Sequence, residues 1–250
     1  PMLALLATAL SPALGVELRP STLTLRNFAD AFANPTIVRA FANSLQLSVA
    51  AAVLCALVAL PFAFLRVMAG NPLVRALDWL ADGPWVVPGT VVALAMILTF
   101  LRPLPLIGSL YGTGAILLVA YLARFLPLIL RPVLAAAAAI EPAQDEAARL
   151  FGAGPVRRMA AILAPAVLPA LSAGAMLAVM TALNELTLSA LLWSSGNETI
   201  GVMVFALQYE GNSTAAAAVS AVSVALVLGM ALALDRLAPH LPRGTLPWRG

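Results

Sequence analysis

Side chains able to do acid–base or nucleophilic chemistry are scarce in this 250-residue sequence. Cys55 is its one cysteine, His240 is its one histidine, and all 14 basic residues are arginine. A phosphate-binding P-loop requires a lysine, so the chain cannot bind ATP through a P-loop of its own. Cys55 lies in an apolar segment and His240 in a tail rich in proline and arginine, which excludes a disulfide framework and a cysteine-based metal site. We therefore expect a protein that is not an enzyme, with no catalytic residues, no cofactor and no metal site.

The densest group of polar residues is the stretch DEAARLFGAGPVRRMAAILAP, from Asp145 to Pro165. Pro142, just before it, suits the first turn of a helix, where its missing N–H group costs nothing. Asp145 and Glu146 follow near the positive end of the helix dipole, and Asp145 can pair with Arg149 one turn later. The sequence thus predicts a short helix that begins at this proline.

That helix is expected to end at about Phe151, where two glycines permit a sharp turn. Gly152 and Gly154 accept positive φ without strain, and Pro155 restarts the chain as a second helix. The first helix presents two small side chains, Ala147 and Ala148, and one large apolar side chain, Phe151. Such a surface suits insertion into a groove on a partner, and an ordinary amphipathic connector is the alternative.

Two ionisable residues, Arg124 and Glu185, interrupt long apolar segments. Each costs roughly 2.5–3.5 kcal/mol at the middle of a membrane span, so each requires an explanation. Thr181, Glu185 and Ser189 recur at every fourth residue, with Asn184 at the edge, which predicts a polar stripe on one helix face. The stripe either lines a solute pathway or joins helices by polar contacts. Arg124 needs a partner or a wet cavity, and Glu185 is the candidate partner.

The elements that position these residues are predicted to be membrane-spanning helices. The chain is 62% apolar and 10% charged, whereas globular proteins are about a quarter charged. Apolar runs of about 20 residues are long enough to cross a bilayer core of roughly 30 Å. Hydropathy predicts spans at about 1–14, 41–65, 85–101, 113–136, 166–192 and 215–234. Because the first is too short to span alone, we expect that the first residues are missing or that the chain is one half of a longer polypeptide.

The placement of arginines predicts how these spans are oriented. The loops after the second, fourth and sixth spans hold nine arginines: Arg66, Arg75, Arg131, Arg149, Arg157, Arg158, Arg236, Arg243 and Arg249. The opposite side holds four: Arg19, Arg26, Arg39 and Arg102. Because cytoplasmic loops carry the excess of positive charge, the 141–165 loop and the C-terminus are expected in the cytoplasm.

Two stretches between the spans are amphipathic enough to form short helices on the outer face. Residues 21–42 are expected to form interfacial helices broken near Pro35, and residues 199–209 a third. Either these segments merely rest on the membrane or they have a docking role.

The 145–165 stretch resembles the "EAA" signature of permease subunits in bacterial binding-protein-dependent ATP-binding cassette importers. The matching positions, at the spacing of that signature, are Glu146, Ala147, Ala148, Gly152, Ile162 and Pro165. One departure is Ala164, where the family usually has leucine. The resemblance covers most of the chain, including the layout of six segments, and implies an all-α integral membrane protein with a cytoplasmic coupling helix.

In this family the coupling helix sits in a groove of a separate ATPase subunit. The resemblance therefore implies an ATP-binding cassette ATPase as a partner. The other implied partners are a soluble solute-binding protein, a second permease half that is fused, homodimeric or heterodimeric, and the lipid bilayer, with no nucleic acid. The implied location is the bacterial cytoplasmic (inner) membrane, with several spans.

The stretch NELTLSALLWSSGNETIGVMVFALQYEG resembles the C-terminal half of ferric-iron-type permeases, which implies ferric iron as the solute. Importers of spermidine, sulfate, thiamine and phosphonate share the general layout and are the alternatives. Glu185 is not assigned as an iron ligand, because one carboxylate without a second hard ligand is no metal site. A secondary transporter, a channel and a membrane scaffold are the alternatives from other classes; a transporter of that kind often shows internal repeats and several midplane charges.

Overall fold

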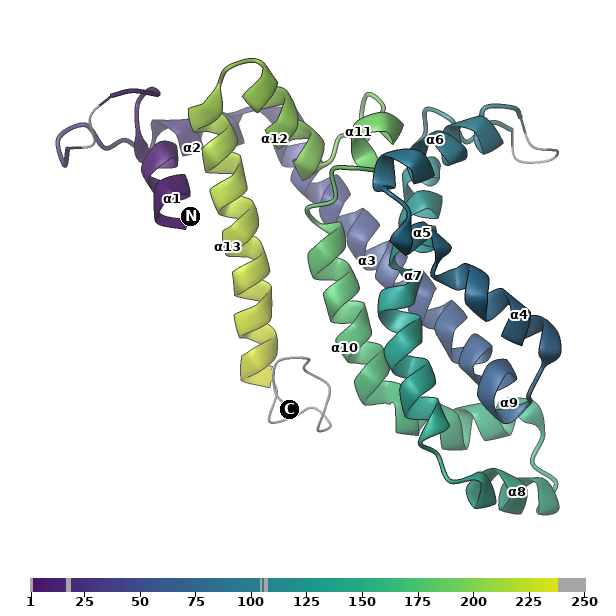
Figure 1. The fold of residues 1–250 in the computed structure, drawn as a ribbon. Coiled ribbons are helices and arrows are strands. Elements are labelled where there is room, and N and C mark those ends of the chain that lie inside the picture. The colour runs from purple at the N-terminus through teal and green to yellow at the C-terminus, as the bar shows by residue number, and fades with distance from the viewer. Residues whose placement is uncertain (1, 17–18, 104, 106–107, 238–250) are drawn as a thin grey trace.

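The structure, a computed structural model, describes residues 2–16, 19–103, 105 and 108–237 and is all-α. In Figure 1 long helices run between two ends of the molecule, with α8 (Pro142–Leu150) at one end and α2 (Arg26–Ala33) and α12 (Ile200–Tyr209) at the other. The remaining elements are α1 (Met2–Leu10), α3 (Pro35–Ala63), the π-helix η1 (Phe64–Met68), α4 (Pro72–Ala81), α5 (Gly83–Val86), α6 (Gly89–Phe100), α7 (Gly114–Ala138), α9 (Pro155–Arg158), the π-helix η2 (Met159–Leu163), α10 (Ala164–Ala182), α11 (Ser189–Leu192) and α13 (Ser213–Leu237).

Four continuous helices are long and apolar enough to cross a membrane among the described residues: Pro35–Met68, Gly114–Ala138, Pro155–Ala182 and Ser213–Arg236. A bent pair, Pro72–Val86 with Gly89–Phe100, passes the same test if it counts as one span. The prediction of an all-α membrane protein is therefore confirmed.

The predicted third span, residues 85–101, is wrong as a straight helix. The chain bends by 114° between the helical stretch Pro72–Val86, which includes α5, and α6. Pro88 causes the break, because a proline disfavours helical geometry in the residue before it, and Val87 is extended with φ −73° and ψ 141°.

The predicted fifth span, residues 166–192, is also wrong beyond its middle, because α10 ends at Ala182 and α11 is a separate turn. Between them, the Leu188 N–H donates to the Glu185 carboxylate at 3.0 Å. A side chain that satisfies the backbone in this way competes with the helix.

The predicted interfacial helices at 21–42 are found only in part. α2 ends at Ala33, and the chain turns at Asn34, whose side chain accepts a hydrogen bond from the Thr36 N–H at 2.9 Å. Residues from Pro35 onward belong to the long helix α3, since proline suits its first turn. The predicted helix at 199–209 corresponds to α12.

The main core is formed by α3, α7 and α10, which pack on one another. The buried face of α3 consists mostly of small residues: Ala40, Ser44, Ser48, Ala51, Ala52, Cys55, Ala59 and Ala63. Small residues let helix backbones approach closely, which is how helices associate in lipid. α10 also approaches α7 closely, because a Cβ atom on Gly174 would lie 2.8 Å from the Ile129 Cα atom.

α13 packs against a second group of helices, α1, α2 and α12. Ala9 of α1 and Ala217, Ala218 and Ala221 of α13 form a small buried cluster in this group. A cavity of about 820 Å³ lies between α1, α12, α13 and the segment after α10. Helices of this second group and the segment after α10 thus border the cavity.

Candidate functional site

α8 and α9 form a helix–turn–helix in the stretch with the EAA spacing. Glu141 occupies the N-cap of α8, and the helix ends in a turn where Gly152 has φ +75°. The Gly152 N–H donates to the Arg149 carbonyl and the Ala153 N–H to the Ala148 carbonyl, both at 2.9 Å. The predicted turn at Gly152 is confirmed. Gly154 is instead extended, at φ −69°, as the N-cap of α9.

Asp145 is the centre of the polar contacts in this unit. Its predicted ion pair with Arg149 is confirmed at 2.9 Å. A second pair was not predicted: Arg158 donates through Nε at 2.6 Å and through Nη2 at 2.5 Å, and both side chains are buried. Burial raises the pKa of Asp145, but hydrogen bonds and charge from Arg158 and Arg149 outweigh it and hold this pKa below its ordinary value.

The same contacts attach the helix–turn–helix to the C-terminal end of α3, where η1 follows. The Arg158 guanidinium lies 5.2 Å from the centroid of the Phe64 ring, a cation–π distance. Arg149 donates to the Met68 carbonyl at 3.0 Å. Since Phe64 and Met68 begin and end η1, the unit is fixed to that π-helix.

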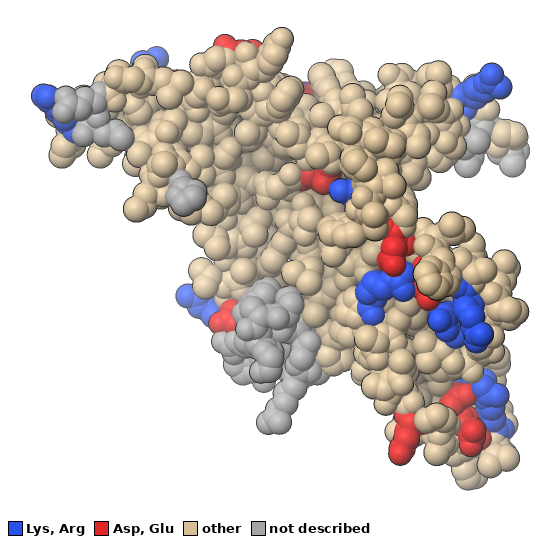
Figure 2. Space-filling model, viewed as in Figure 1, with Lys and Arg blue, Asp and Glu red and all other residues tan. Residues whose placement is uncertain are grey.

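Large apolar side chains are exposed on the outer surface of the unit, beside charged ones. Leu150 and Phe151 are 89% and 91% exposed, and Val156 is also exposed. Grooves of about 220 Å³ flank α8 on two sides, one of them lined by Ala148, Phe151 and Ile162. Of the residues with the EAA spacing, four are exposed and two are half-buried: Glu146, Ala147, Gly152 and Pro165, then Ala148 and Ile162. In Figure 2, charged side chains gather at this end, where α8 and α9 lie in Figure 1.

The predicted polar stripe on the fifth span is wrong, because its members are not on one helix. Thr181 is in α10 and donates to the Leu177 carbonyl at 2.7 Å. Asn184 follows that helix, lines the 820 Å³ cavity and accepts from Ser223 of α13 at 2.5 Å. Glu185 accepts from the Thr187 hydroxyl and from the Leu188 N–H.

Ser189 has a different partner in a different place. It is fully buried at the start of α11, and its hydroxyl lies 2.8 Å from the Tyr121 hydroxyl of α7. Ser189 therefore joins two helices and does not extend the cavity wall.

The suggested pairing of Arg124 with Glu185 is wrong. Arg124 donates through Nη1 to the carbonyls of Pro84, at 2.7 Å, and Val87. Its guanidinium also lies 5.4 Å from the centroid of the Trp85 ring. These contacts place Arg124 at the break between α5 and α6.

Sequence reasoning missed a group of charges that joins α4 to α7. Arg131 pairs with Asp78 and with Asp82, both at 2.7 Å, and Asp78 also pairs with Arg66 at 3.1 Å. The members lie up to 65 residues apart, so no helical period connects them.

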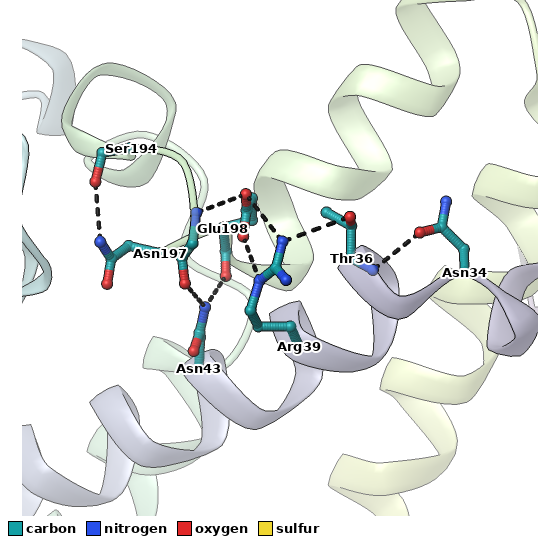
Figure 3. A network of polar contacts seen from close by, with 8 residues as sticks. Asn34, Thr36, Arg39, Asn43, Ser194, Asn197 and Glu198 are labelled. Carbon is teal, nitrogen blue, oxygen red and sulfur yellow. Dashed lines mark hydrogen bonds and ion pairs between the residues drawn. The ribbon is translucent and has the colours of Figure 1, made fainter.

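A further polar group, drawn in Figure 3, fastens the loop before α12 to the start of α3. Glu198 pairs with Arg39 at 3.1 Å, and Asn43 donates to the carbonyls of Gly196 and Glu198. Burial raises the pKa of Glu198, but the hydrogen bonds from Arg39 and from the Gly196 N–H hold it below its ordinary value.

Comparison with known proteins identifies relatives for most of the chain. A family model described as "Binding-protein-dependent transport system inner membrane component" matches residues 56–246. The probable ABC transporter permease protein y4fN of Sinorhizobium fredii is 32% identical over 98% of this chain and 43% of its own length. The putative 2-aminoethylphosphonate transport system permease protein PhnU of Salmonella typhimurium is 34% identical over 60% of this chain and 50% of its own length.

Two other matches are more distant. The Fe(3+)-transport system permease protein FbpB 2 of Haemophilus influenzae is 26% identical over 66% of this chain and 32% of its own length. A chain of a bacterial alginate ABC transporter, solved with its alginate-bound periplasmic protein, has a TM-score of 0.70 at 18% identity, over 95% of this chain and 87% of that one. The chain spans half the length of these three curated relatives, or less.

Proposed function

Since this chain belongs to the family of binding-protein-dependent transport system inner membrane components, we propose that it is the permease subunit of an ATP-driven importer. It forms part of the solute pathway and couples that pathway to a separate ATPase subunit. It does not itself hydrolyse ATP. A soluble solute-binding protein and a second permease half complete the importer in the bacterial inner membrane, with the 141–165 loop and the C-terminus in the cytoplasm.

The observation that carries this proposal is the exposed apolar face of the helix–turn–helix. Leu150 and Phe151 project where the long helices end, and large apolar side chains that gather at one exposed place mark an interaction site. The ATPase groove receives this face. The residues proposed to make the coupling surface are Glu146, Ala147, Ala148, Gly152, Ile162 and Pro165.

For the pathway, we propose the cavity of about 820 Å³ that Asn184 lines. Hydroxyl and amide side chains are its polar lining: Thr8, Asn184, Gln208, Ser213, Ser220 and Ser223. Thr181 and Glu185 lie close to Asn184 in sequence, at the end of α10 and just after it. Ser189 and Arg124 instead make contacts between the helices around the cavity.

The solute is proposed from the relatives. The relative named for 2-aminoethylphosphonate is 34% identical to this chain, and the one named for ferric iron is 26% identical. We therefore place an organophosphonate first and ferric iron second. Uptake of both solutes, each with the binding protein encoded beside this chain, decides between them.

The experiment that tests the function is uptake into vesicles that hold the complete importer. Uptake should require ATP, the ATPase subunit and the binding protein. Transport by this chain alone on an ion gradient would instead identify a secondary transporter or a channel. Unchanged uptake by cells that lack the chain would identify a scaffold.

The orientation has a separate test. Ala153→Cys should react with an impermeant probe only from the cytoplasmic face, and labelling from outside would contradict the proposed orientation.

A further inference from the structure

The break between α5 and α6 leaves backbone carbonyls without a helical donor. In a continuous helix the Pro84 carbonyl would accept from the N–H group four residues later. That residue is Pro88, which has no N–H group. The Val87 carbonyl would accept from the Val91 N–H in a continuous helix. That N–H instead donates to the Pro88 carbonyl at 2.9 Å, so the Val87 carbonyl also lacks a helical donor. Unsatisfied backbone groups are costly inside a bilayer, so these two carbonyls need donors from elsewhere.

Arg124 of α7 supplies those donors. Its Nη1 atom donates to the carbonyls of both Pro84 and Val87, and its guanidinium lies over the Trp85 ring. Trp85 in turn packs against Phe125, the neighbour of Arg124 on α7, with ring centroids 6.4 Å apart. Arg124 thus caps the end of α5 and fixes where α6 begins.

Tyr121, three residues before Arg124 on the same helix, holds the break in the fifth span. Its hydroxyl lies 2.8 Å from the Ser189 hydroxyl, and both residues are fully buried. The segment that ends at Ser189 is the one in which Glu185 interrupts the helix. One turn of α7 therefore contacts both interrupted spans.

The two breaks also touch each other. A Cβ atom on Gly89, the first residue of α6, would lie 2.7 Å from the Thr187 Cβ atom, nearer than real Cβ atoms approach. A Cβ atom on Gly201 of α12 would lie 3.0 Å from the Glu185 carbonyl oxygen. Because Asn184, Leu186 and Gly201 line the 820 Å³ cavity, the position of the two breaks shapes its wall.

We propose that Arg124 and Tyr121 are positioning residues for transport: from one turn of α7 they hold the breaks at 87–88 and 183–188 against each other. This proposal rests on the proposed function, because it assigns the cavity wall to the solute pathway. Neither residue touches the solute.

The experiment measures the contact between the breaks directly. In a Cys55→Ala background of the full chain with its ATPase, Gly89→Cys with Thr187→Cys should form a disulfide, since the two Cβ atoms need to separate by only about 1 Å to reach the usual distance. Arg124→Met should reduce the yield of this disulfide and lower uptake by at least about tenfold, while the chain still inserts and co-purifies with the ATPase. Arg124→Lys, which keeps one cationic donor nitrogen, should recover part of both signals.

Arg75→Met is the matched control, because Arg75 is an exposed arginine of α4 in the same bent pair and should change neither signal. Tyr121→Phe, which removes a single hydroxyl, should lower the disulfide yield as well, and adding Ser189→Ala should cost little more. If Arg124→Met fails to insert, Tyr121→Phe and Arg124→Lys decide the question.

Loss of uptake with an unchanged disulfide yield would overturn the proposal, because Arg124 would then act on the solute and not on the breaks. Unchanged values of both would also overturn it. The disulfide forms without transport, so a wild-type chain that shows no ATP-driven uptake would contradict the proposed function and leave this test intact.

Discussion

Asp145 joins three segments through one carboxylate. It accepts from Arg149 in its own helix and from Arg158 beyond the turn, and Arg158 stacks on Phe64 of η1. A buried charge is tolerated only when it is paired, so each member of this group depends on the others.

Asp145→Asn should disorder the helix–turn–helix. The change leaves Arg158 buried without a counter-charge, and breaking a buried pair in this way costs about 3–5 kcal/mol. Hydrogen exchange in residues 142–163 should accelerate, while exchange in α7 and α10 stays as in wild type. Asp145→Leu with Arg158→Met is the control: it removes both charges and should exchange more slowly than Asp145→Asn. Equal protection in wild type and Asp145→Asn would contradict this account.

The pH dependence of the same unit follows from the lowered pKa of Asp145. A carboxyl whose pKa is lower in the folded state stabilises that state above its ordinary pKa and loses the effect as pH falls through the lowered value. Protection of residues 142–163 should therefore stay constant from neutral pH down to about the ordinary value of 3.8 and fall only below it.

Gly152 determines the turn between α8 and α9. Its φ of +75° disfavours a side chain, and a Cβ atom there would meet nothing within 4 Å, so the cost of substitution is conformational and not steric. Gly152→Val should cost about 1–2 kcal/mol. If the loop is marginally stable, this cost lowers the ratio of correctly folded to unfolded loop by about 5–30-fold. We expect normal insertion with loss of transport and of co-purification with the ATPase.

Gly154→Val is the matched control for this prediction. Gly154 also has nothing within 4 Å, but its backbone is extended, a geometry that β-branched residues accept. It should retain most of the transport and of the association with the ATPase. If the two valine variants behave alike, the turn does not require a glycine and the coupling surface is not formed as proposed.

The helices differ in how far their sequences predict them. Hydropathy predicts 113–136, close to α7 at Gly114–Ala138, because this mostly apolar helix stays continuous past Pro127 and Pro132. It misses the break at 183–188, where no glycine or proline occurs and the Glu185 side chain ends the helix.

Side-chain contacts differ in the same way. The Asp145–Arg149 pair follows from helical spacing, whereas Arg158 reaches Asp145 only through the turn at Gly152. Contacts that depend on tertiary geometry, such as Arg124 on Pro84, have no periodic signal.

The core of α3, α7 and α10 connects the proposed coupling surface to the cavity. The helix–turn–helix is fixed to η1 at the end of α3, and both broken spans are fixed to α7. The helix–turn–helix and the two broken spans are therefore held by the same three packed helices. If the proposed coupling surface moves with the ATPase, the motion has to pass through the contacts among these three helices.

Gly174 tests that packing. A Cβ atom there would lie 2.8 Å from both the Ile129 Cα atom and the Leu128 carbonyl oxygen, so Gly174→Ala must push α10 away from α7. Overpacking of this kind typically costs about 1–3 kcal/mol, which lowers Tm by roughly 2–4 °C per kcal/mol in a chain of this size. Gly229→Ala in α13 is the control, since nothing lies within 4 Å of its Cβ position and alanine favours a helix more than glycine does. Thermal unfolding in detergent should show Gly174→Ala below wild type and Gly229→Ala at or above it. The same shift in both variants would mean that the close contact between α7 and α10 does not carry the stability of the core.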